Sequence, residues 1–352
     1  MPKTRLSRAT PSRKKQHIDI TLTKDVGFRE KTTGLEQWEF VHNALPGINF
    51  SEIDTSTTFL KKRLSVPFMV SCMTGGYADA LRINRGLAEV CEDLGIAMGV
   101  GSQRQALEHT AFHRTFRVVR EVAPSIPIVG NIGAAEVASM DSAEMVKRLV
   151  NLIGADAFAI HLNPLQELLQ PEGNTNFKGV LNGIALMVRE LPVPVIVKEI
   201  GAGISPAVAK RLLEIGVQYI DIAGAGGTSW AGVEILRRGR ENSARQFWDW
   251  GIPTATALHD VVTLRSSGYT FQIIAYGGIS TGMEAAKCIG LGADMVASAR
   301  PMLKALVNGG KRALKSLIVE WGSDLRSAMF LTGSATVRDL QNAPLARYGT
   351  NA

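Results

Sequence analysis

Residues 157–167 read Ala157-Phe-Ala-Ile-His-Leu-Asn-Pro-Leu-Gln-Glu167, an apolar run that changes at once into a polar cluster. The run Ala157–Ile160 predicts a buried strand of a parallel sheet. An imidazole, two amides and a carboxylate follow within seven residues, and Pro164 prevents the strand from continuing. Because α/β enzymes place their chemistry at the carboxyl ends of strands, the cluster from His161 to Glu167 predicts a functional site. A solvated loop is the alternative interpretation.

Seven more apolar runs predict further buried strands, and amphipathic helices separate most of them. The helix over Ser205–Ile215 carries the clearest signals, with Ser205 as N-cap and Pro206 in the first helical position. Strand–helix alternation implies parallel strands with right-handed crossovers, and eight units over about 250 residues predict an α/β fold, the (β/α)8 TIM barrel. The further strands are expected at Pro67–Cys72, Ile96–Val100, Ile126–Gly130, Pro194–Val197, Tyr219–Ile222, Phe271–Ala275 and Met295–Ser298, and other helices at Ala80–Leu94, Ser142–Ile153 and Thr281–Leu291.

The chain is expected to form one domain, with additional segments before and after the barrel in the sequence. Residues 1–65 are an N-terminal basic arm and a mixed lead-in segment, residues 66–323 are the barrel, and residues 324–352 are a C-terminal helical extension. Within the barrel, residues 230–255 hold three of the five tryptophans and predict a loop insertion after the sixth strand. That insertion is interpreted either as a lid or as a subunit contact.

The composition is that of a folded chain with an excess of basic residues. Of its 352 residues, 45% are hydrophobic and only 20% are charged, which is enough apolar surface for a large core. Part of the net charge of +7 lies in the first fifteen residues, and a basic arm can bind nucleic acid, a membrane surface or a small phosphorylated ligand. The three cysteines lack metal-type spacing and predict reduced thiols in a cytoplasmic protein. We expect neither a signal peptide nor a membrane span.

The runs expected as the seventh and eighth strands are followed by a phosphate-binding pattern. Gly277, Gly278 and Ile279 lead straight into a helix, whose N-terminus and backbone N–H groups can hold a phosphate. TIM barrels often bind phosphate after these two strands, and Arg300, beside the small Ala299, can add a charged fork. Glycines that serve only tight turns are the alternative.

Lys198 ends the apolar run Val195-Ile-Val, where a buried strand is not expected to carry a charge. Three interpretations stay open: a Schiff base, contact with the pyrimidine edge of a flavin, or an ion pair with a core carboxylate. Neutral polar groups after other strands favour a polar heterocycle such as an isoalloxazine ring, which needs donors and acceptors around its edge. These groups are the amides of Gln103 and Asn131 and the hydroxyls of Thr74, Ser102 and Thr228.

Seven motifs occur in order along the chain: Arg13-Lys-Lys-Gln-His17, Met73-Thr-Gly-Gly76, Ser102-Gln-Arg104, His161-Leu-Asn-Pro-Leu-Gln-Glu167, Val197-Lys-Glu-Ile-Gly201, Gly226-Gly-Thr-Ser-Trp230 and Gly277-Gly-Ile279. With these motifs the chain, from about Arg13 to its C-terminus, resembles the type 2 isopentenyl diphosphate isomerases. The resemblance implies an FMN-dependent barrel enzyme that needs Mg2+ and a flavin reduced by NADPH. It also implies the reaction, the interconversion of isopentenyl and dimethylallyl diphosphate in isoprenoid biosynthesis.

The same resemblance implies roles for individual residues. The FMN ring is expected to contact Met73, Thr74, Gly75, Ser102, Asn131, Lys198 and Thr228, and the FMN phosphate to contact Gly277, Gly278, Ile279, Ala299 and Arg300. The substrate is expected to contact Arg13, Lys14, His17, Ser102, Gln103, Arg104 and Gln166. Mg2+ is expected on Glu167, and His161, Asn163 and Gln166 are the expected catalytic residues.

The isomerisation would add a proton at one carbon and remove one from another, through a carbocation-like transition state. No paired carboxylates stand out for this task. The resemblance therefore implies reduced FMN as the acid and base, with Gln166 relaying or orienting protons.

Two other classes of protein compete with this interpretation. An FMN-dependent 2-hydroxy acid oxidase or dehydrogenase needs a base histidine and an arginine near the sixth strand, and the loop Gly224-Ala-Gly-Gly-Thr-Ser-Trp230 contains neither. A nucleic-acid binder would leave the polar strand ends unexplained, and a membrane-surface role rests on the arm alone. We expect a small allylic or homoallylic diphosphate as ligand, no nucleic-acid or membrane partner, and a homo-oligomer, since tetramers and octamers are common in the similar family.

Overall fold

The computed structural model describes residues 9–239 and 244–348, and its centre is a closed barrel of eight parallel strands. The strands follow one another in chain order around the barrel, so each pairs with the next, and the last pairs with the first. This arrangement confirms the predicted (β/α)8 fold. The strands are β4 Phe68–Val70, β5 Ala97–Gly99, β6 Ile128–Gly133, β7 Ala157–His161, β8 Val195–Lys198, β9 Tyr219–Asp221, β10 Gln272–Ala275 and β11 Met295–Ser298.

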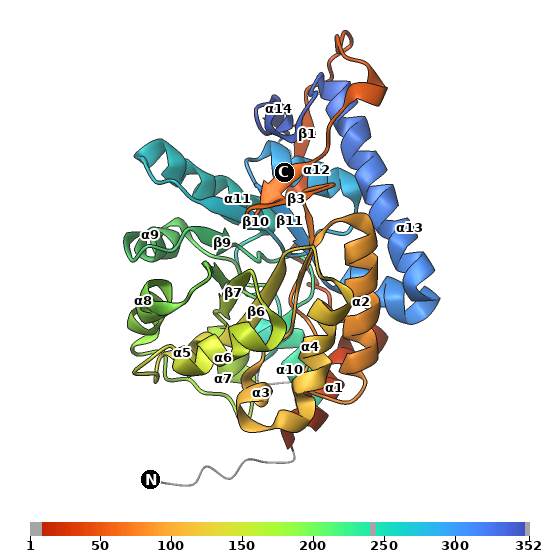
Figure 1. Ribbon diagram of the computed structural model, residues 1–352. Coiled ribbons are helices and arrows are strands. Elements are labelled where there is room, and N and C mark those ends of the chain that lie inside the picture. The colour runs from red at the N-terminus through yellow and green to blue at the C-terminus, as the bar shows by residue number, and fades with distance from the viewer. Residues whose placement is uncertain (1–8, 240–243, 349–352) are drawn as a thin grey trace.

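Helices surround the barrel, and local sequence signals set many of their ends (Figure 1). Ser205 caps the helix that begins at Pro206, and Thr281 with Glu284 forms a capping box at the start of the helix from Gly282. The helices are α2 Ala80–Leu94, α3 Arg104–Glu108, α4 His113–Val122, α5 Ala134–Val137, α6 Glu144–Ile153, α7 Pro164–Leu169, α8 Val180–Glu190, α9 Pro206–Glu214, α10 Trp230–Arg238, α11 Thr254–Val262, α12 Gly282–Gly290 and α13 Arg300–Thr332. Not one helix of the described residues is both long and apolar enough to cross a membrane.

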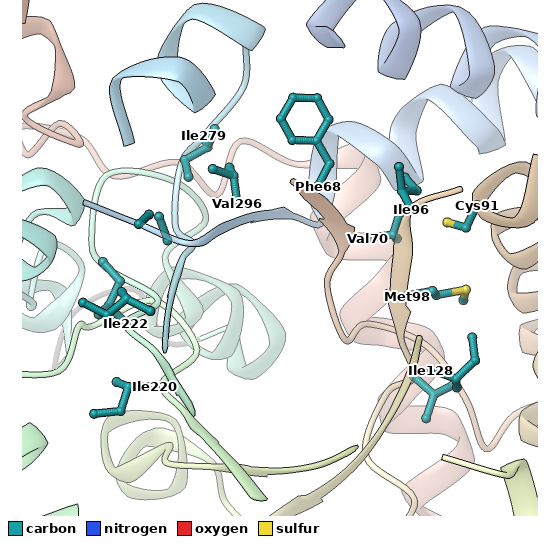
Figure 2. Close-up of a cluster of buried hydrophobic side chains, with 14 of the residues drawn as sticks. Phe68, Val70, Cys91, Ile96, Met98, Ile128, Ile220, Ile222, Ile279 and Val296 are labelled. Atoms are coloured by element: carbon teal, nitrogen blue, oxygen red, sulfur yellow. The ribbon is translucent and has the colours of Figure 1, made fainter. Parts of the chain in front are cut away.

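Two apolar layers alternate along the strands. Phe68 and Val70 of β4 belong to the layer between barrel and helices, whereas Met69 between them belongs to the layer inside the barrel. This alternation is the period of two that a strand imposes on its side chains. Figure 2 shows part of the outer layer, with Phe68, Val70 and Met98 on the barrel strands and Cys91 on α2. Both layers leave the polar strand ends free to form a site.

A β-hairpin closes the amino-terminal end of the barrel. It consists of β2 Thr57–Phe59 and β3 Lys62–Leu64, and its turn residues have the positive φ angles of 50° and 64°. Phe59 is fully buried, and it packs with the residues inside the barrel. Since this end is filled, ligands have access only from the carboxyl ends of the strands, where TIM barrels hold their sites.

The N-terminal arm forms a helix, α1 Ala9–Thr23, and lies across the open mouth of the barrel. In Figure 1, α1 lies with α3, α7 and α10 at the lower end of the molecule. The short strand β1 Trp38–Phe40 lies near the upper end and pairs with β12 Leu345–Arg347. The chain therefore has its two terminal segments on opposite ends of the barrel.

Helices lie at two places where the sequence predicted a segment boundary or a loop. The boundary at 323 falls inside α13, which runs from Arg300 to Thr332 with a break in helical geometry at Gly310. The extension beyond it adds α14 Val337–Gln341 and β12, because its apolar residues pack back onto α12. The expected loop insertion begins as a helix, α10, and continues with the 3-10 helix Arg245–Phe247, while residues 240–243 lie outside the described ones. Its apolar residues, including the buried Val233, explain the helix.

Candidate active site

Two cavities meet at the open mouth of the barrel. The glycine-lined cavity has a volume of about 320 Å3 and is bordered by the loops after β9, β10 and β11. The polar cavity has a volume of about 160 Å3 and is bordered by α1, α7 and the ends of β5 to β8. Six residues border both cavities: Ile18, Cys72, Met73, Lys198, Ile200 and Trp230. A ligand in one cavity would therefore touch a ligand in the other at a largely apolar junction.

The glycine-lined cavity has the features of a phosphate cradle. The backbone N–H groups of Gly278 and Ile279 donate to no other group of the described residues, and they precede the N-terminus of α12. Gly278 has a φ angle of 74°, and a Cβ atom there would collide with Thr33 and Gly226. Ala299, which precedes α13, borders the same space. Two helix N-termini with unpaired N–H groups make this corner suitable for an anion.

Arg300 borders this cavity, but its guanidinium is already bound to α1. Nε donates to the carbonyl oxygen of Thr21 at 2.8 Å, and Nη2 donates to that of Lys24 at 3.1 Å. These carbonyls belong to the C-terminal end of the helix, where a positive charge is favourable. Arg300 therefore ties the arm to the phosphate-binding corner, a contact that the sequence did not predict.

Lys198 lies at the junction of the two cavities, at the end of β8. Its Nζ donates to the carbonyl oxygen of Glu199 at 2.6 Å and lies 3.6 Å from Oδ2 of Asp221. It also lies 4.8 Å from the centre of the Tyr276 ring. The predicted ion pair with a core carboxylate is thus present, and the same ammonium borders both cavities.

Asn163, Gln166 and Glu167 project from the start of α7 into the polar cavity. Nδ2 of Asn163 donates to Oε1 of Glu167 at 2.8 Å and to Oε1 of Gln166 at 3.1 Å. Oε2 of Glu167 accepts from the backbone N–H of Asn174 at 2.6 Å. Oδ1 of Asn163 is buried and has no partner among the described residues, so a ligand donor or a cation would satisfy it.

His161 is held as a neutral ring at the end of β7. Its Nδ1 lies 2.7 Å from Oδ1 of Asn131 on the neighbouring strand. Burial, and then the positive charges of Lys198 and Lys14, lower the pKa of His161 to about 3. Because an amide oxygen only accepts, Nδ1 carries the proton. Nε2 is then left as an acceptor.

The arm brings three basic residues, Arg13, Lys14 and His17, to the polar cavity. Nζ of Lys14 donates to the carbonyl oxygens of Gly75 at 2.9 Å and Ser102 at 2.7 Å. Burial, and then the charge of Arg13, lower the pKa of Lys14 to about 7. Lys14 therefore joins α1 to the ends of two barrel strands, besides lining the cavity.

Glu234 of α10 completes the polar cavity from behind, and it is not among the residues that the sequence predicted. Its Oε1 lies 2.9 Å from Nε2 of His17 and accepts from Nε2 of Gln166 at 3.3 Å. Its Oε2 lies 2.8 Å from Nε of Arg237. The available signal was a carboxylate between Val233 and Ile235, where a helix face is otherwise apolar. Cys72 and Tyr276, which line the cavities, were also missed, although Tyr276 directly follows β10 and Cys72 comes two residues after β4.

The structure brings most of the predicted site residues to the two cavities. The glycine-lined cavity receives Met73, Lys198, Thr228, Gly277, Gly278, Ile279, Ala299 and Arg300. The polar cavity receives Arg13, Lys14, His17, Met73, Gly75, Ser102, Arg104, Asn131, His161, Asn163, Gln166, Glu167 and Lys198. Gly75, Ser102 and Asn131, expected beside FMN, therefore line the polar cavity instead of the glycine-lined one.

Thr74 and Gln103 lie behind the cavity walls. The Thr74 hydroxyl bonds to Asn84, and Nε2 of Gln103 donates to the carbonyl oxygen of Leu149 at 3.2 Å. Oε1 of Gln103 accepts from the backbone N–H of Asn131 at 3.1 Å. Both side chains are buried and line neither cavity, because their polar groups satisfy the barrel's own backbone and side chains.

Residues 6–120 and 167–347 match the FMN-dependent dehydrogenase family. An isopentenyl-diphosphate delta-isomerase of Chlorobium luteolum is 48% identical over 351 residues, which cover 96% of each protein. One of Methanothermobacter thermautotrophicus is 45% identical over 337 residues, which cover 96% of this chain and 93% of the relative.

Solved structures of two oxidases share the fold. A lactate oxidase of Pediococcus acidilactici has a TM-score of 0.69 at 16% identity and covers 99% of this chain and 97% of its own. A mandelate oxidase has a TM-score of 0.65 at 17% identity and covers 98% of this chain and 99% of its own. Similarity at this level concerns the barrel alone. The family match and the near full-length relatives together show that the chain belongs to the FMN-dependent, type 2 isopentenyl-diphosphate delta-isomerase family.

Proposed function

We propose that this protein interconverts isopentenyl diphosphate and dimethylallyl diphosphate. The observation that carries the proposal is the junction of the two cavities, where Ile18, Ile200 and Trp230 separate a phosphate cradle from a polar cavity rich in cations. A diphosphate in the polar cavity would place a short hydrocarbon chain against these apolar side chains. The names of the relatives identify isopentenyl diphosphate as the substrate to test.

The glycine-lined cavity fits FMN. The N–H groups of Gly278 and Ile279 and the two helix N-termini would hold its phosphate, and Lys198 and Thr228 would border its ring. When bound and reduced, FMN would supply the acid–base chemistry, since no pair of carboxylates lines the apolar junction among the residues that the structure describes. The hydroxyl of Thr228 and the ammonium of Lys198 are two of the donors that border this cavity.

The polar cavity fits Mg2+ only together with a diphosphate. Within residues 9–239 and 244–348, no group of three or more His, Cys, Asp or Glu residues is arranged so that it could hold a metal ion by itself. Glu167 and the unpartnered Oδ1 of Asn163 would be the protein's oxygen donors, and phosphate oxygens and waters would supply the rest. The ion would offset the negative charge of the diphosphate and fix its position in the cavity.

The remaining roles follow from the groups of the chain itself. Arg13 and His17 would bind the diphosphate, and Arg104 would join them after exchanging its contact with Glu136, at 2.8 Å, for the ligand. Gln166, held by Asn163 and Glu234, would orient protons at the junction. Neutral His161 would accept a hydrogen bond at Nε2. Trp230 and Ile18 would exclude water from a developing positive charge.

The oxidation of a 2-hydroxy acid is the second candidate, because the structural neighbours with this fold are lactate and mandelate oxidases. Residues 224–230 contain no histidine and no arginine, so the base and the carboxylate-binding group are missing from the loop after β9. This argument favours the isomerase.

Anaerobic turnover tests the proposal. Purified protein would receive FMN, Mg2+ and isopentenyl diphosphate, with no reductant, with NADPH or with dithionite, and dimethylallyl diphosphate would be quantified. We expect product only with a reductant, and NADPH is the proposed physiological one. Absence of product from protein whose bound FMN is reduced would overturn the substrate assignment. Lactate and mandelate, assayed under air, would test the oxidase.

The proposal also covers the oligomeric state and the cellular location of the protein. We propose a homo-oligomer, a tetramer or octamer, in the cytoplasm. The three free thiols, Cys72, Cys91 and Cys288, agree with a reducing compartment. Light scattering would measure the oligomer, and a monomer at micromolar concentration would contradict that part.

A further inference from the structure

Asp221 lies directly behind Lys198 on the neighbouring strand of the barrel. The register of β8 and β9 pairs the two residues, and Oδ2 of Asp221 lies 3.6 Å from the Lys198 ammonium. The side chain of Asp221 is 1% exposed, so this carboxylate cannot reach a ligand in either cavity. Whatever Asp221 does at the site, it does through another residue.

The Asp221 carboxylate is fixed on its other side. Its Oδ1 accepts the backbone N–H of Ala223 at 3.2 Å. Ala223 has a φ angle of 34°, a value that residues with a side chain rarely adopt. The strained turn holds the carboxylate still and begins the loop that borders the glycine-lined cavity with Gly224 and Gly226.

The ammonium of Lys198 is aimed by three contacts. The Glu199 carbonyl and the Asp221 carboxylate hold it from behind and the side, and the Tyr276 ring lies 4.8 Å away. Burial lowers the pKa of Lys198, but Asp221 first, and then Tyr276, Cys72 and Glu199, raise it, so that the pKa lies above its usual value. These contacts favour the charged form of Lys198 at the junction of the two cavities.

We infer that Asp221 is a positioning residue, which keeps the Lys198 ammonium charged and aimed at the cavity where FMN would bind. The inference rests on the proposed function, since it concerns a flavin that works in its reduced, electron-rich form. A fixed cation favours reduced over oxidised flavin, because reduction adds negative charge to the ring. Asp221 would thereby set how readily the flavin is reduced, and how the reduced ring is oriented for proton transfer.

The first variant is Asp221→Asn, which keeps the shape and the acceptor for Ala223 but removes the charge. We expect the midpoint potential of bound FMN to fall, because reduced FMN should lose about tenfold more affinity than oxidised FMN, and kcat to fall about tenfold to a hundredfold. Potentials are measured by anaerobic titration with a reference dye, without substrate. An unchanged potential in a folded, FMN-loaded variant would overturn the inference.

A second variant, Asp221→Glu, tests the positioning role of Asp221 if Asp221→Asn does not fold. It keeps the charge but moves it by one methylene group, so we expect a near-native potential with a reduced kcat. A wild-type kcat in Asp221→Glu would contradict the positioning role. Asp156→Asn is the matched control, because Asp156 is an ion-paired aspartate at the amino-terminal end of β7, with Lys62 at 2.7 Å and Arg120 at 2.6 Å. It should lower stability without moving the potential.

These measurements separate the inference from the proposed function. The potential of bound FMN requires no isomerase activity. If the wild-type protein binds FMN but does not isomerise, the proposed function fails, while a shifted potential in Asp221→Asn would still support the role of Asp221.

Discussion

The Nε2 atom of His17 lies 2.9 Å from Oε1 of Glu234, and this contact joins α1 to α10 beside the polar cavity. The Glu234 side chain is fully buried and that of His17 is 12% exposed. The same carboxylate oxygen accepts from Gln166, so one acidic residue links the arm to a proposed catalytic amide. The position of the arm and the orientation of Gln166 therefore depend on each other.

Glu234→Gln should loosen the arm. The buried Glu234 carboxylate is ion-paired with Arg237 at 2.8 Å and faces His17 at 2.9 Å. Removing one partner of a buried ion pair costs about 3 kcal/mol, so we expect a large rise in KM for isopentenyl diphosphate and faster proteolysis within residues 9–23. Glu172→Gln is the control, because Glu172 is 39% exposed and its pairs with Arg13 and Arg237 contribute less than about 1 kcal/mol. Equal effects of the two substitutions would contradict the special role of Glu234.

Glu167→Gln should weaken the dependence on Mg2+. The amide keeps one oxygen but loses the charge, and we expect the Mg2+ concentration for half-maximal rate to rise at least about tenfold. Glu136→Gln provides the comparison, since Glu136 lines the same cavity and is paired with Arg104. Rates measured against Mg2+ concentration check this, and a native Mg2+ profile in Glu167→Gln would remove it as the ligand.

Gln166→Ala should lower kcat while leaving FMN bound. Gln166 lines the polar cavity but not the glycine-lined one, so its loss removes proton orientation without touching the cofactor cradle. We expect kcat to fall about a hundredfold, a usual effect for a group that assists proton transfer. FMN affinity, followed by fluorescence, should change little. Gln218→Ala, an exposed residue beside the start of β9, serves as control. A native kcat in Gln166→Ala would exclude the relay.

Gly278→Ala should impair FMN binding. A methyl group there would collide with Thr33 and the backbone of Gly226, at a φ angle of 74°. Gly268→Ala is the matched control, because Gly268 has a φ angle of 90° but nothing within 4 Å of its Cβ position. Both variants bear the backbone strain of about 1 kcal/mol, and only Gly278→Ala should lose FMN affinity. Parallel losses in the two variants would assign the effect to strain alone.

His161 should make the protein less stable in acid. Its pKa is lowered from 6.5 to about 3, so between these values the unfolded chain binds a proton that the folded chain does not. The ring therefore lowers the free energy of unfolding as the pH falls through this window, by roughly 3 kcal/mol at pH 4, and has no effect above about pH 7.

Urea unfolding of wild type and His161→Gln from pH 4 to 8 measures this effect. As the pH falls, the free energy of unfolding should decrease more for the wild type than for His161→Gln. His259→Gln, at a histidine that is 52% exposed, should follow the wild-type curve. Parallel curves for wild type and His161→Gln would show that the ring does not resist protonation.

Much of the fold could be predicted from the sequence, because local patterns of residues specify its helices and strands. The helix expected at Ala80–Leu94 has those bounds in the structure, and each of the eight expected strands overlaps a barrel strand. His161, Asn163, Gln166 and Glu167 after β7, and Gly277 to Ile279 after β10, were expected at a site because they directly follow apolar runs, and they line the two cavities. The directions of the Thr74 and Gln103 side chains were not predicted. Both residues lie in loops that follow strands, but their side chains form hydrogen bonds with Asn84 and Leu149, away from the cavities.

By itself, the sequence determined the barrel, its functional end and the family, since hydrophobic period, caps and motifs act within a few residues. Only the tertiary structure decided how the arm lies over the mouth. Arg300 binds Thr21 and Lys24, and Glu234 binds His17, across more than two hundred residues of chain. Such contacts depend on which helix faces the closed barrel after it forms. The side chains that make these contacts, Arg300, Glu234 and His17, are of ordinary polar types, and they acquire a role only when burial removes water from them.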